Sequence, residues 1–301
     1  MTIRIINTCN QFCLHCMQQS GPNEKDIMSL ETFQNTLEFI NSTSTKLINI
    51  SGGEPTLHPE LLDFLKLAIK YNKEIVLLTN GSYLLNNPKL RHEIFILMLK
   101  HKNLSMQVTS VKNIYSNFTH QKNFEKELKP LLIYKKVKDR IVYVNTLENG
   151  IVPVGRALNN LTKLTEQIRT TSEAPRCFNL YNALRHFKGN LIETISYVKQ
   201  NSSTSLCIPL VIENGDMLFG EYGNTCNVVW NVNNTNKNPI LKIEDLNGPC
   251  GACYVSKKQE GNVNIHLACY PNKHNKITDS YLYKVEFSTE TIVPSSIKYG
   301  E

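Results

Sequence analysis

The sequence has no long hydrophobic run, no secretory signal and no low-complexity tract. Its longest apolar stretches are short and interrupted by charged residues, so no segment is long enough to span a bilayer. In the absence of a secretory signal, nine cysteines point to metal ligation in a reducing compartment more than to a disulfide framework. A chain of 301 residues with 41% hydrophobic content can bury a sizeable core, so we expect a globular cytoplasmic protein.

The sequence also lacks a dense stripe of basic residues, although its formal net charge is +7. Lys and Arg are scattered along the chain without interleaved aromatic residues, which argues against a nucleic-acid-binding face. Such a charge is typical of a solvated basic surface, and it would also favour an acidic peptide or an acidic electron donor such as a flavodoxin. We expect no nucleic-acid partner and no membrane partner.

Three of the cysteines are closely spaced near the start of the chain. Cys9, Cys13 and Cys16 form a C-x-x-x-C-x-x-C run directly after a short apolar strand predicted at residues 3–6. Three thiolates on one loop can each ligate a different iron of a cubane cluster, which leaves the fourth iron open to another ligand. The alternative is a zinc site, which would need a fourth ligand such as His15.

A second motif follows the next predicted strand, at residues 46–50. Gly52 and Gly53 are followed by Glu54 and Pro55, which places a double glycine and an acid at the carboxyl end of that strand. Paired glycines let the backbone approach a ligand closely at such a position. A turn of this kind means little alone, and its weight comes from the cysteine run beside it.

Strands and helices alternate through the first half of the chain. The patterns predict strands at residues 3–6, 46–50, 75–78, 104–108 and 140–147, and helices at 30–40, from about 59, at 88–99 and at 124–134. Ser29 is a suitable cap for the first of these helices. Repeated βα units close into a barrel or a partial barrel and gather ligand groups at the carboxyl ends of their strands.

Together these motifs resemble the radical S-adenosylmethionine (radical SAM) superfamily. The resemblance rests on the cysteine run, on residues 52–55, on Leu78-Thr79-Asn80-Gly81 after the third strand, and on Gly155-Arg156-Ala157. It implies an α/β fold, a partial (β/α)6 TIM-like barrel over residues 1–160. It also implies a [4Fe-4S] cluster whose open iron chelates S-adenosylmethionine, and an electron from the cluster would then generate a 5′-deoxyadenosyl radical that takes hydrogen from a substrate.

The resemblance assigns roles to residues near the cysteine run. The three cysteines would ligate the cluster, and His15 would pack near the adenine without acting as a ligand. The backbone of Gly52 and Gly53 would hold the methionyl amino group, and the Glu54 carboxylate would accept from that ammonium.

Further roles fall on the loops after later strands. Thr79 and Asn80 would hydrogen-bond the ribose or the carboxylate, although Asn80 before Gly81 could equally be a plain turn residue. Ser110, at the end of the fourth strand, would contact the nucleotide. Arg156 carries a planar fork suited to a carboxylate, and its setting resembles that of the arginine that grips the carboxylate of the cofactor.

From residue 206 onward the texture changes to short strands separated by Gly and Asn, after a predicted helical bridge at residues 161–205. We expect residues 206–301 to form a small cysteine-rich α+β domain, which resembles the twitch or SPASM auxiliary-cluster domains of peptide-modifying radical SAM enzymes. The match is incomplete, because Gly220 stands where those domains usually carry a cysteine. The expected ligands are Cys207, Cys250 and Cys253 with either Cys226 or Cys269, and the alternative is structural zinc bound by the same thiolates.

The resemblance favours a maturase of a ribosomally made precursor peptide, with a flavodoxin or ferredoxin-type electron donor. The outcome would be epimerisation, with Cys226 as the hydrogen donor if it is not a cluster ligand, or crosslinking. No leader-binding domain precedes the cysteine run, so a leader would need a separate binding protein or an exposed edge such as residues 281–287. The alternatives are a radical SAM enzyme that acts on a small molecule such as a sugar or nucleoside, and a non-catalytic zinc-binding interaction module.

Overall fold

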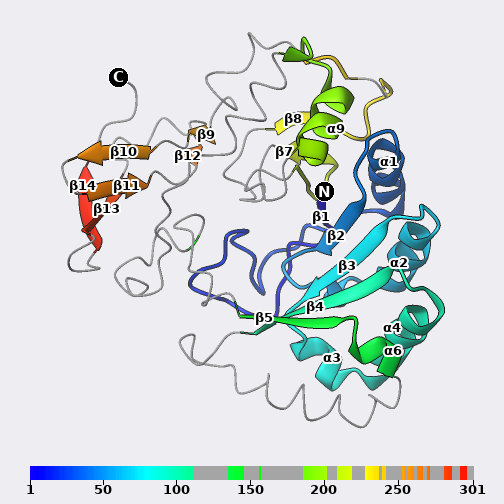
Figure 1. The fold of residues 1–301 in the computed structure, drawn as a ribbon. Coiled ribbons are helices and arrows are strands. Elements are labelled where there is room, and N and C mark those ends of the chain that lie inside the picture. The colour runs from blue at the N-terminus through cyan, green and yellow to red at the C-terminus, as the bar shows by residue number, and fades with distance from the viewer. Residues whose placement is uncertain are drawn as a thin grey trace.

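The structure is a computed structural model. It describes residues 1–110, 135–145, 156, 186–201, 209–218, 228–236 and 239–241, together with the backbone of short strands between residues 253 and 296. Figure 1 shows these parts, with helices packed on one face of a curved sheet and the cysteine loop on its other side.

The first half of the chain alternates strands and helices as the sequence predicts. Its strands are β1 (Thr2–Arg4), β2 (Leu47–Ser51), β3 (Glu74–Thr79), β4 (Leu104–Ser110) and β5 (Ile141–Asn145). Its helices are α1 (Leu30–Asn41), the 3-10 turn η1 (Pro55–Leu57), α2 (Leu61–Ile69), α3 (Ser82–Asn86), α4 (Pro88–Lys100) and α6 (Lys135–Lys138). The Ser29 cap is confirmed, because its side chain accepts from the backbone N–H of Thr32. The helix predicted at residues 124–134 lies outside the described residues.

Eight strands form one sheet in the order β5-β4-β3-β2-β1-β6-β7-β8. Strands β1 to β5 are parallel, so each βα unit adds its strand to the same growing edge. Strand β6 (Leu210–Val211) pairs in parallel with the other side of β1, and β7 (Asp216–Leu218) and β8 (Val228–Asn231) continue antiparallel. The arrangement is a partial TIM-like barrel, as expected.

Side chains alternate between the two faces of this sheet. One row, buried against the helices, crosses five paired strands and contains Ile3, Ile50, Leu77, Met106 and Ile141. The register places a second row on the opposite, inner face: Arg4, Ser51, Leu78, Gln107 and Val142. The apolar core thus lies between sheet and helices, and the inner face is left to neutral polar and aliphatic groups around one buried arginine.

The strands β6 to β8 are attached to the barrel by packing as well as by pairing. Trp230 of β8 stacks against Phe39 of α1 with ring centroids 4.9 Å apart. Glu213, in the turn between β6 and β7, forms a buried ion pair with Arg4 of β1. The predicted domain boundary at residue 206 stays a prediction, but the first strands beyond it share the barrel's sheet.

The remaining elements are α9 (Leu191–Asn201), which lies within the predicted helical bridge at residues 161–205, and short strands near the C-terminus. Strands β10 (Lys257–Glu260), β11 (Val263–His266), β13 (Tyr281–Glu286) and β14 (Ile292–Ser296) form an antiparallel sheet in that order, and β9 (Cys253–Tyr254) pairs with β12 (Tyr270–Pro271).

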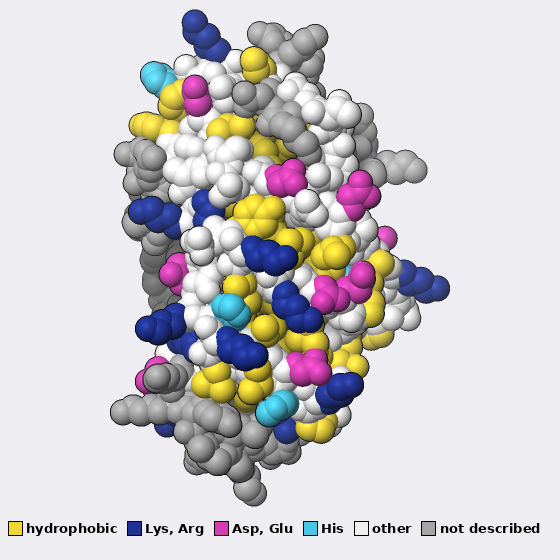
Figure 2. Space-filling model, turned by 90° about the vertical axis from the view of Figure 1, so that its right-hand side faces the viewer, with side chains coloured by type: hydrophobic (Ala, Val, Ile, Leu, Met, Phe, Trp, Pro, Cys, Tyr) yellow, Lys and Arg dark blue, Asp and Glu magenta, His cyan; other side chains and the backbone are white. Residues whose placement is uncertain are grey.

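Two surface properties complete the description. None of the helices in the described ranges is both long and apolar enough to cross a membrane. On the helix-covered face, Lys, Arg, Asp and Glu side chains are interspersed with hydrophobic ones (Figure 2).

Candidate active site

The cysteine run lies on the loop that follows β1, at the carboxyl ends of the parallel strands. Cys9 is buried, Cys13 and Cys16 are half-buried, and all three thiols are free. The loop is closed at its base, because the Cys9 N–H donates to the Gly21 carbonyl at 3.0 Å. Three thiols are therefore presented on one fixed loop.

This donor set fits a cluster better than a single metal ion. Among the residues that the structure describes, no three His, Cys, Asp or Glu side chains converge on a point that one ion could occupy. A zinc ion draws each of its sulfurs to about 2.3 Å, whereas a cubane spreads its thiolates over separate iron corners. Within the described residues, the geometry therefore gives no support to a zinc site that includes His15.

Burial raises the pKa of the Cys9 thiol to about 12 and that of the Cys13 thiol to about 11. Neighbouring thiols and Glu54 add to the shift at Cys9, whereas the Arg156 cation lowers the pKa of Cys13 against that trend. Iron binds thiolates, so metal uptake displaces the protons that these thiols hold at neutral pH. The free energy of cluster binding must include that cost.

Gly52 and Gly53 let the end of β2 pack directly against the segment that leads into the cysteine loop. A Cβ on Gly53 would lie 2.5 Å from the carbonyl oxygens of Asn7 and Thr8, and one on Gly52 would lie 2.7 Å from that of Ile6. The Gly53 N–H donates to Ile6 at 2.6 Å, and the Glu54 N–H donates to Thr8 at 2.9 Å. The close approach expected for a ligand is thus already made to the chain itself, and the predicted contact with the methionyl group stays a prediction.

Glu54 is fully buried and accepts four hydrogen bonds. Its Oε1 accepts from the Thr56 N–H at 3.1 Å, the Thr56 hydroxyl at 2.5 Å and the Thr79 hydroxyl at 2.6 Å, and its Oε2 accepts from the Asn80 N–H at 2.7 Å. Burial raises the pKa of this carboxyl, and the four donors act in the opposite direction. The Glu54 side chain therefore connects η1 to the end of β3. Its contact with the methionyl ammonium, which the resemblance implies, stays a prediction.

Asn80 takes the turn role that the sequence left open, and its contact with the ribose or the carboxylate stays a prediction. Its Oδ1 accepts from the Ser82 N–H at 2.9 Å, which is the plain turn role, while Gly81 adopts φ 74° in the same turn. Its Nδ2 donates to Asn10 at 3.1 Å and approaches the Cys9 Sγ at 3.8 Å. The amide is therefore placed to donate to a cluster ligand, which is one way a protein tunes an iron-sulfur site.

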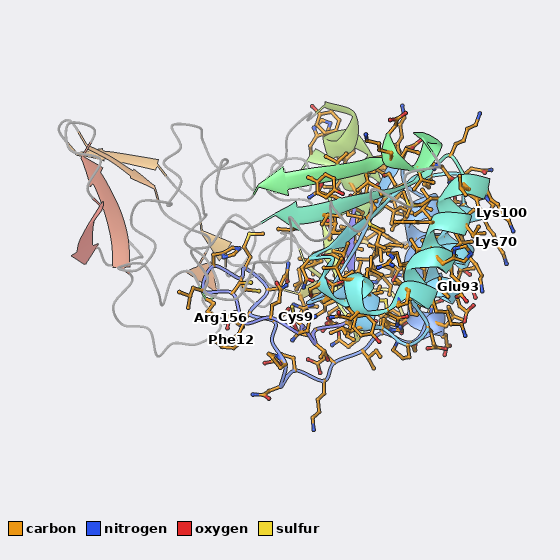
Figure 3. The ribbon with its side chains drawn as sticks, turned by 90° about the horizontal axis from the view of Figure 1, so that it is seen from below. Cys9, Phe12, Lys70, Glu93, Lys100 and Arg156 are labelled. Carbon is orange, nitrogen blue, oxygen red and sulfur yellow. The ribbon has the colours of Figure 1, made fainter. Side chains whose placement is uncertain are left out.

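The Arg156 side chain packs against the cysteine loop. Its Nη1 donates to the Cys13 carbonyl at 2.8 Å and its Nη2 to the Ser20 carbonyl at 2.6 Å. Seen from below, Cys9, Phe12 and Arg156 lie together, far from Lys70 and Lys100 on the helix side (Figure 3). The predicted grip on the carboxylate of the cofactor remains a prediction, since these contacts are to the loop.

His15 is half-buried on the same loop. Burial, followed by the charge of Arg156, lowers the pKa of its imidazole to about 4. The ring is therefore neutral at physiological pH, which suits packing beside an uncharged base. The contact with adenine stays a prediction.

For several predicted site residues, the side chain or the whole residue lies outside the described part of the structure. The backbone of Ser110 ends β4 beside Asn145 of β5, but its side chain is outside the described residues. Cys253 begins β9, and only its backbone is described. The other predicted C-terminal positions fall outside the described residues, namely Cys207, Cys226, Cys250 and Cys269.

Sequence reasoning missed the second charged contact to this loop. Arg4 donates to Glu213 through Nε at 2.7 Å and Nη2 at 2.9 Å, and its Nη1 donates to Gln18 at 3.0 Å. The one available signal was an arginine between the isoleucines of an otherwise apolar strand. This signal indicated a buried arginine but did not identify Glu213 as its partner.

Comparisons with known proteins agree with this geometry. A model of the radical SAM superfamily matches residues 3–147. The antilisterial bacteriocin subtilosin biosynthesis protein AlbA of Bacillus subtilis is 31% identical over 81 residues, which cover 27% of this chain and 18% of that protein. GTP 3′,8-cyclase of Helicobacter pylori is 37% identical over 84 residues, which cover 26% of each chain. The chain thus spans 18% and 26% of the lengths of these curated relatives.

A crystal structure of BtrN in complex with AdoMet and 2-DOIA covers 82% of both chains with a TM-score of 0.50 and 16% identity. At that identity the likeness concerns the fold alone. The superfamily uses a [4Fe-4S] cluster with S-adenosylmethionine, and the thiol loop, the glycine pair and the parallel sheet provide their setting. Residues 3–147 of this chain form a radical SAM domain.

Proposed function

We propose that this protein is a radical SAM enzyme that cleaves S-adenosylmethionine reductively and abstracts hydrogen from a ribosomally made peptide. The observation that carries the proposal is the loop of three free thiols held against the Gly52–Glu54 turn, at the carboxyl ends of parallel strands. When bound, the cluster and S-adenosylmethionine supply an electron and a 5′-deoxyadenosyl radical that takes a hydrogen atom from the substrate.

The chain's own residues bind and orient these groups. Cys9, Cys13 and Cys16 would hold the cluster, and Asn80 would donate to the Cys9 sulfur. The inner face of the sheet continues from there with Ser51, Leu78 and Gln107, where a substrate would lie. These three residues are uncharged, and Arg4 beside them is paired with Glu213, so this described part of the face suits an uncharged portion of a substrate.

The peptide assignment is supported by the relative AlbA, whose name refers to bacteriocin biosynthesis. Two outcomes are open within it. In epimerisation, a thiol returns a hydrogen atom to the opposite face of the substrate Cα; Cys226 is the proposed donor, and its thiyl radical regains an electron and a proton from the reducing system. In crosslinking, the substrate radical bonds to a second group, whose bond to hydrogen breaks as its proton leaves to solvent; the remaining electron would pass to an acceptor, for which we propose a C-terminal auxiliary cluster.

A nucleotide or another small molecule is the second candidate substrate. The relative with the higher identity over its aligned region is named GTP 3′,8-cyclase. The chemistry at the cysteine loop is the same in both cases, so the substrate is decided elsewhere in the chain. A zinc-binding protein without catalysis is a candidate of another class, and a colourless product after anaerobic reconstitution would favour it.

The partners follow from the chemistry proposed. A flavodoxin or ferredoxin-type protein would supply electrons, and a separate leader-binding protein would present the precursor peptide. Both are proposals that the identity of the substrate would sharpen.

Counting iron and sulfide tests the site assignment. After anaerobic reconstitution, the wild type should bind about four more irons per chain than a variant with Cys9, Cys13 and Cys16 all replaced by Ala. Equal counts in the two proteins would contradict the assignment.

Incubation with peptides from neighbouring small reading frames and, in parallel, with nucleoside triphosphates should then yield a product from the peptides only.

The hydrogen-donor assignment has its own test. Cys226→Ala should abolish epimerisation while 5′-deoxyadenosine still forms. Loss of both activities, with iron content unchanged, would refute a donor role limited to the second step.

A further inference from the structure

Arg156 reaches the cysteine loop from 143 positions away in the chain and contacts it at three backbone carbonyls. Its side chain donates to Cys13 at 2.8 Å and to Ser20 at 2.6 Å, and its own N–H donates to Cys16 at 3.0 Å. Two of these carbonyls belong to residues that would ligate the cluster. Arg156 therefore holds the loop backbone at the second and third cysteines and at Ser20.

The guanidinium also stacks on an aromatic ring of the same loop. Its Cζ lies 3.6 Å from the centroid of the Phe12 ring, and Phe12 is 66% exposed although Arg156 is 8% exposed. An exposed phenylalanine gains little from hydrophobic burial, but its face can stabilise a cation that is directed at backbone carbonyls. The ring closes the outer side of this contact.

Gly21 leaves the space that this stack occupies. A Cβ on Gly21 would lie 3.0 Å from the edge of the Phe12 ring and 3.7 Å from Nη2 of Arg156. The loop base, the ring and the guanidinium therefore fit together at van der Waals distance. Three separate features of the loop are adapted to one arginine.

The cation also acts electrostatically on the loop. The guanidinium lies within hydrogen-bond distance of the Cys13 carbonyl, so its charge is held next to a residue that would ligate the cluster. A positive charge beside an iron-sulfur site favours the reduced form, which carries one more negative charge. Removing this charge should make the cluster harder to reduce.

We propose that Arg156, stacked on Phe12, is a positioning residue that clamps the cysteine loop around the cluster and raises its reduction potential. The inference rests on the proposed function only in requiring that the loop holds a cluster. It departs from the role that the resemblance implies for Arg156, a grip on the carboxylate of S-adenosylmethionine. The two roles make different predictions for the same variants.

The test compares Arg156→Ala, Arg156→Lys and Phe12→Leu with Lys100→Ala, an exposed charge removed on the helix side (Figure 3). Each protein is reconstituted anaerobically, and iron and sulfide content, the rate of iron loss to a chelator, the midpoint potential and the Kd for S-adenosylmethionine are measured. The clamp predicts that Arg156→Ala loses iron about tenfold faster, because charge-assisted hydrogen bonds to two carbonyls are lost. It also predicts a lower midpoint potential, because the positive charge beside the cluster is removed. Arg156→Lys and Phe12→Leu should lie between Arg156→Ala and the wild type, and Lys100→Ala should match the wild type.

If Arg156 instead binds the carboxylate of S-adenosylmethionine, Arg156→Ala should raise the Kd for S-adenosylmethionine and leave the cluster measurements unchanged. If Arg156→Ala keeps wild-type iron content, iron-loss rate and potential, the clamp is wrong, whether or not the Kd for S-adenosylmethionine rises. Far-UV circular dichroism of the apoproteins checks folding, and if Arg156→Ala does not fold, the iron-loss rates of Arg156→Lys and Phe12→Leu decide, with wild-type rates in both refuting the clamp. A wild type that binds the cluster but does not cleave S-adenosylmethionine would contradict the proposed function and leave this inference standing.

Discussion

The carboxyl ends of β1 to β3 and the helix side of the molecule contain the same residue types in opposite environments. At the carboxyl ends, Glu54 and the Arg4–Glu213 pair are buried. On the helix side and at the amino end of β3, Glu74 and the Lys66–Asp63 pair are exposed. Identical chemistry therefore has different consequences, because only the buried groups depend on partners that the fold must supply.

That difference locates the site. Buried charged groups without a compensating partner are costly, so the burial of Glu54 and the Arg4–Glu213 pair at this end of the sheet points to a functional role there. The exposed groups are solvated and contribute little. The expected effects below run from the largest to the smallest, each with a matched residue as its control.

Glu54→Ala should produce the largest loss of stability. The change removes the acceptor of buried donors on Thr56, Thr79 and Asn80, which we expect to cost about 4 kcal/mol in the free energy of unfolding. Urea denaturation of the apoprotein measures it. Glu74→Ala, at the exposed start of strand β3, whose other end Glu54 contacts, should change stability by less than about 0.5 kcal/mol. Similar losses in both variants would break the comparison.

Arg4→Met should cost nearly as much, about 3 kcal/mol, because it leaves the Glu213 carboxylate buried without its cation. Adding Glu213→Leu should recover part of that loss, since the unpaired charge is then removed as well. The exposed pair is the control: Lys66→Ala should cost less than about 1 kcal/mol. A double variant less stable than Arg4→Met would count against the ion pair.

The sequence predicted much of the fold and only part of the site. Alternating apolar residues predicted the strands around Ile50 and Leu77, and Ser29 predicted its helix start, because these signals are local. The contacts of Arg4 with Glu213 and of Arg156 with Cys13 span 209 and 143 positions. No local pattern specifies such partners, since they depend on which strands become neighbours.

Gly53→Ala should have a smaller effect on stability, about 2 kcal/mol, and a clear effect on iron content. Its Cβ would lie 2.5 Å from the backbone carbonyls of Asn7 and Thr8, so the segment before Cys9 must move. Gly21→Ala is the matched change, because its Cβ meets the exposed Phe12 ring, which can shift. We expect urea denaturation to place Gly21→Ala within about 1 kcal/mol of the wild type. If Gly53→Ala kept full stability and iron content, the close packing of β2 on this segment would be unimportant.

Asn80→Ala should give the smallest effect: it removes an acceptor in the turn at Ser82 and the amide donor nearest the cluster. Loss of the amide donor 3.8 Å from the Cys9 sulfur should lower the midpoint potential by about 20 to 60 mV, the equivalent of one weak hydrogen bond. Redox titration followed by electron paramagnetic resonance measures the shift. Asn86→Ala, at the exposed end of α3, should leave the potential unchanged, and a shift of equal size there would remove the significance of the Asn80 result.

The most direct test of the central claim is the fate of S-adenosylmethionine in the reconstituted, reduced protein. The account predicts that dithionite or a reduced flavodoxin yields 5′-deoxyadenosine and methionine in equal amounts, and that the variant lacking Cys9, Cys13 and Cys16 yields neither. Intact S-adenosylmethionine after incubation with the cluster-loaded wild type, with and without candidate substrates, would contradict it.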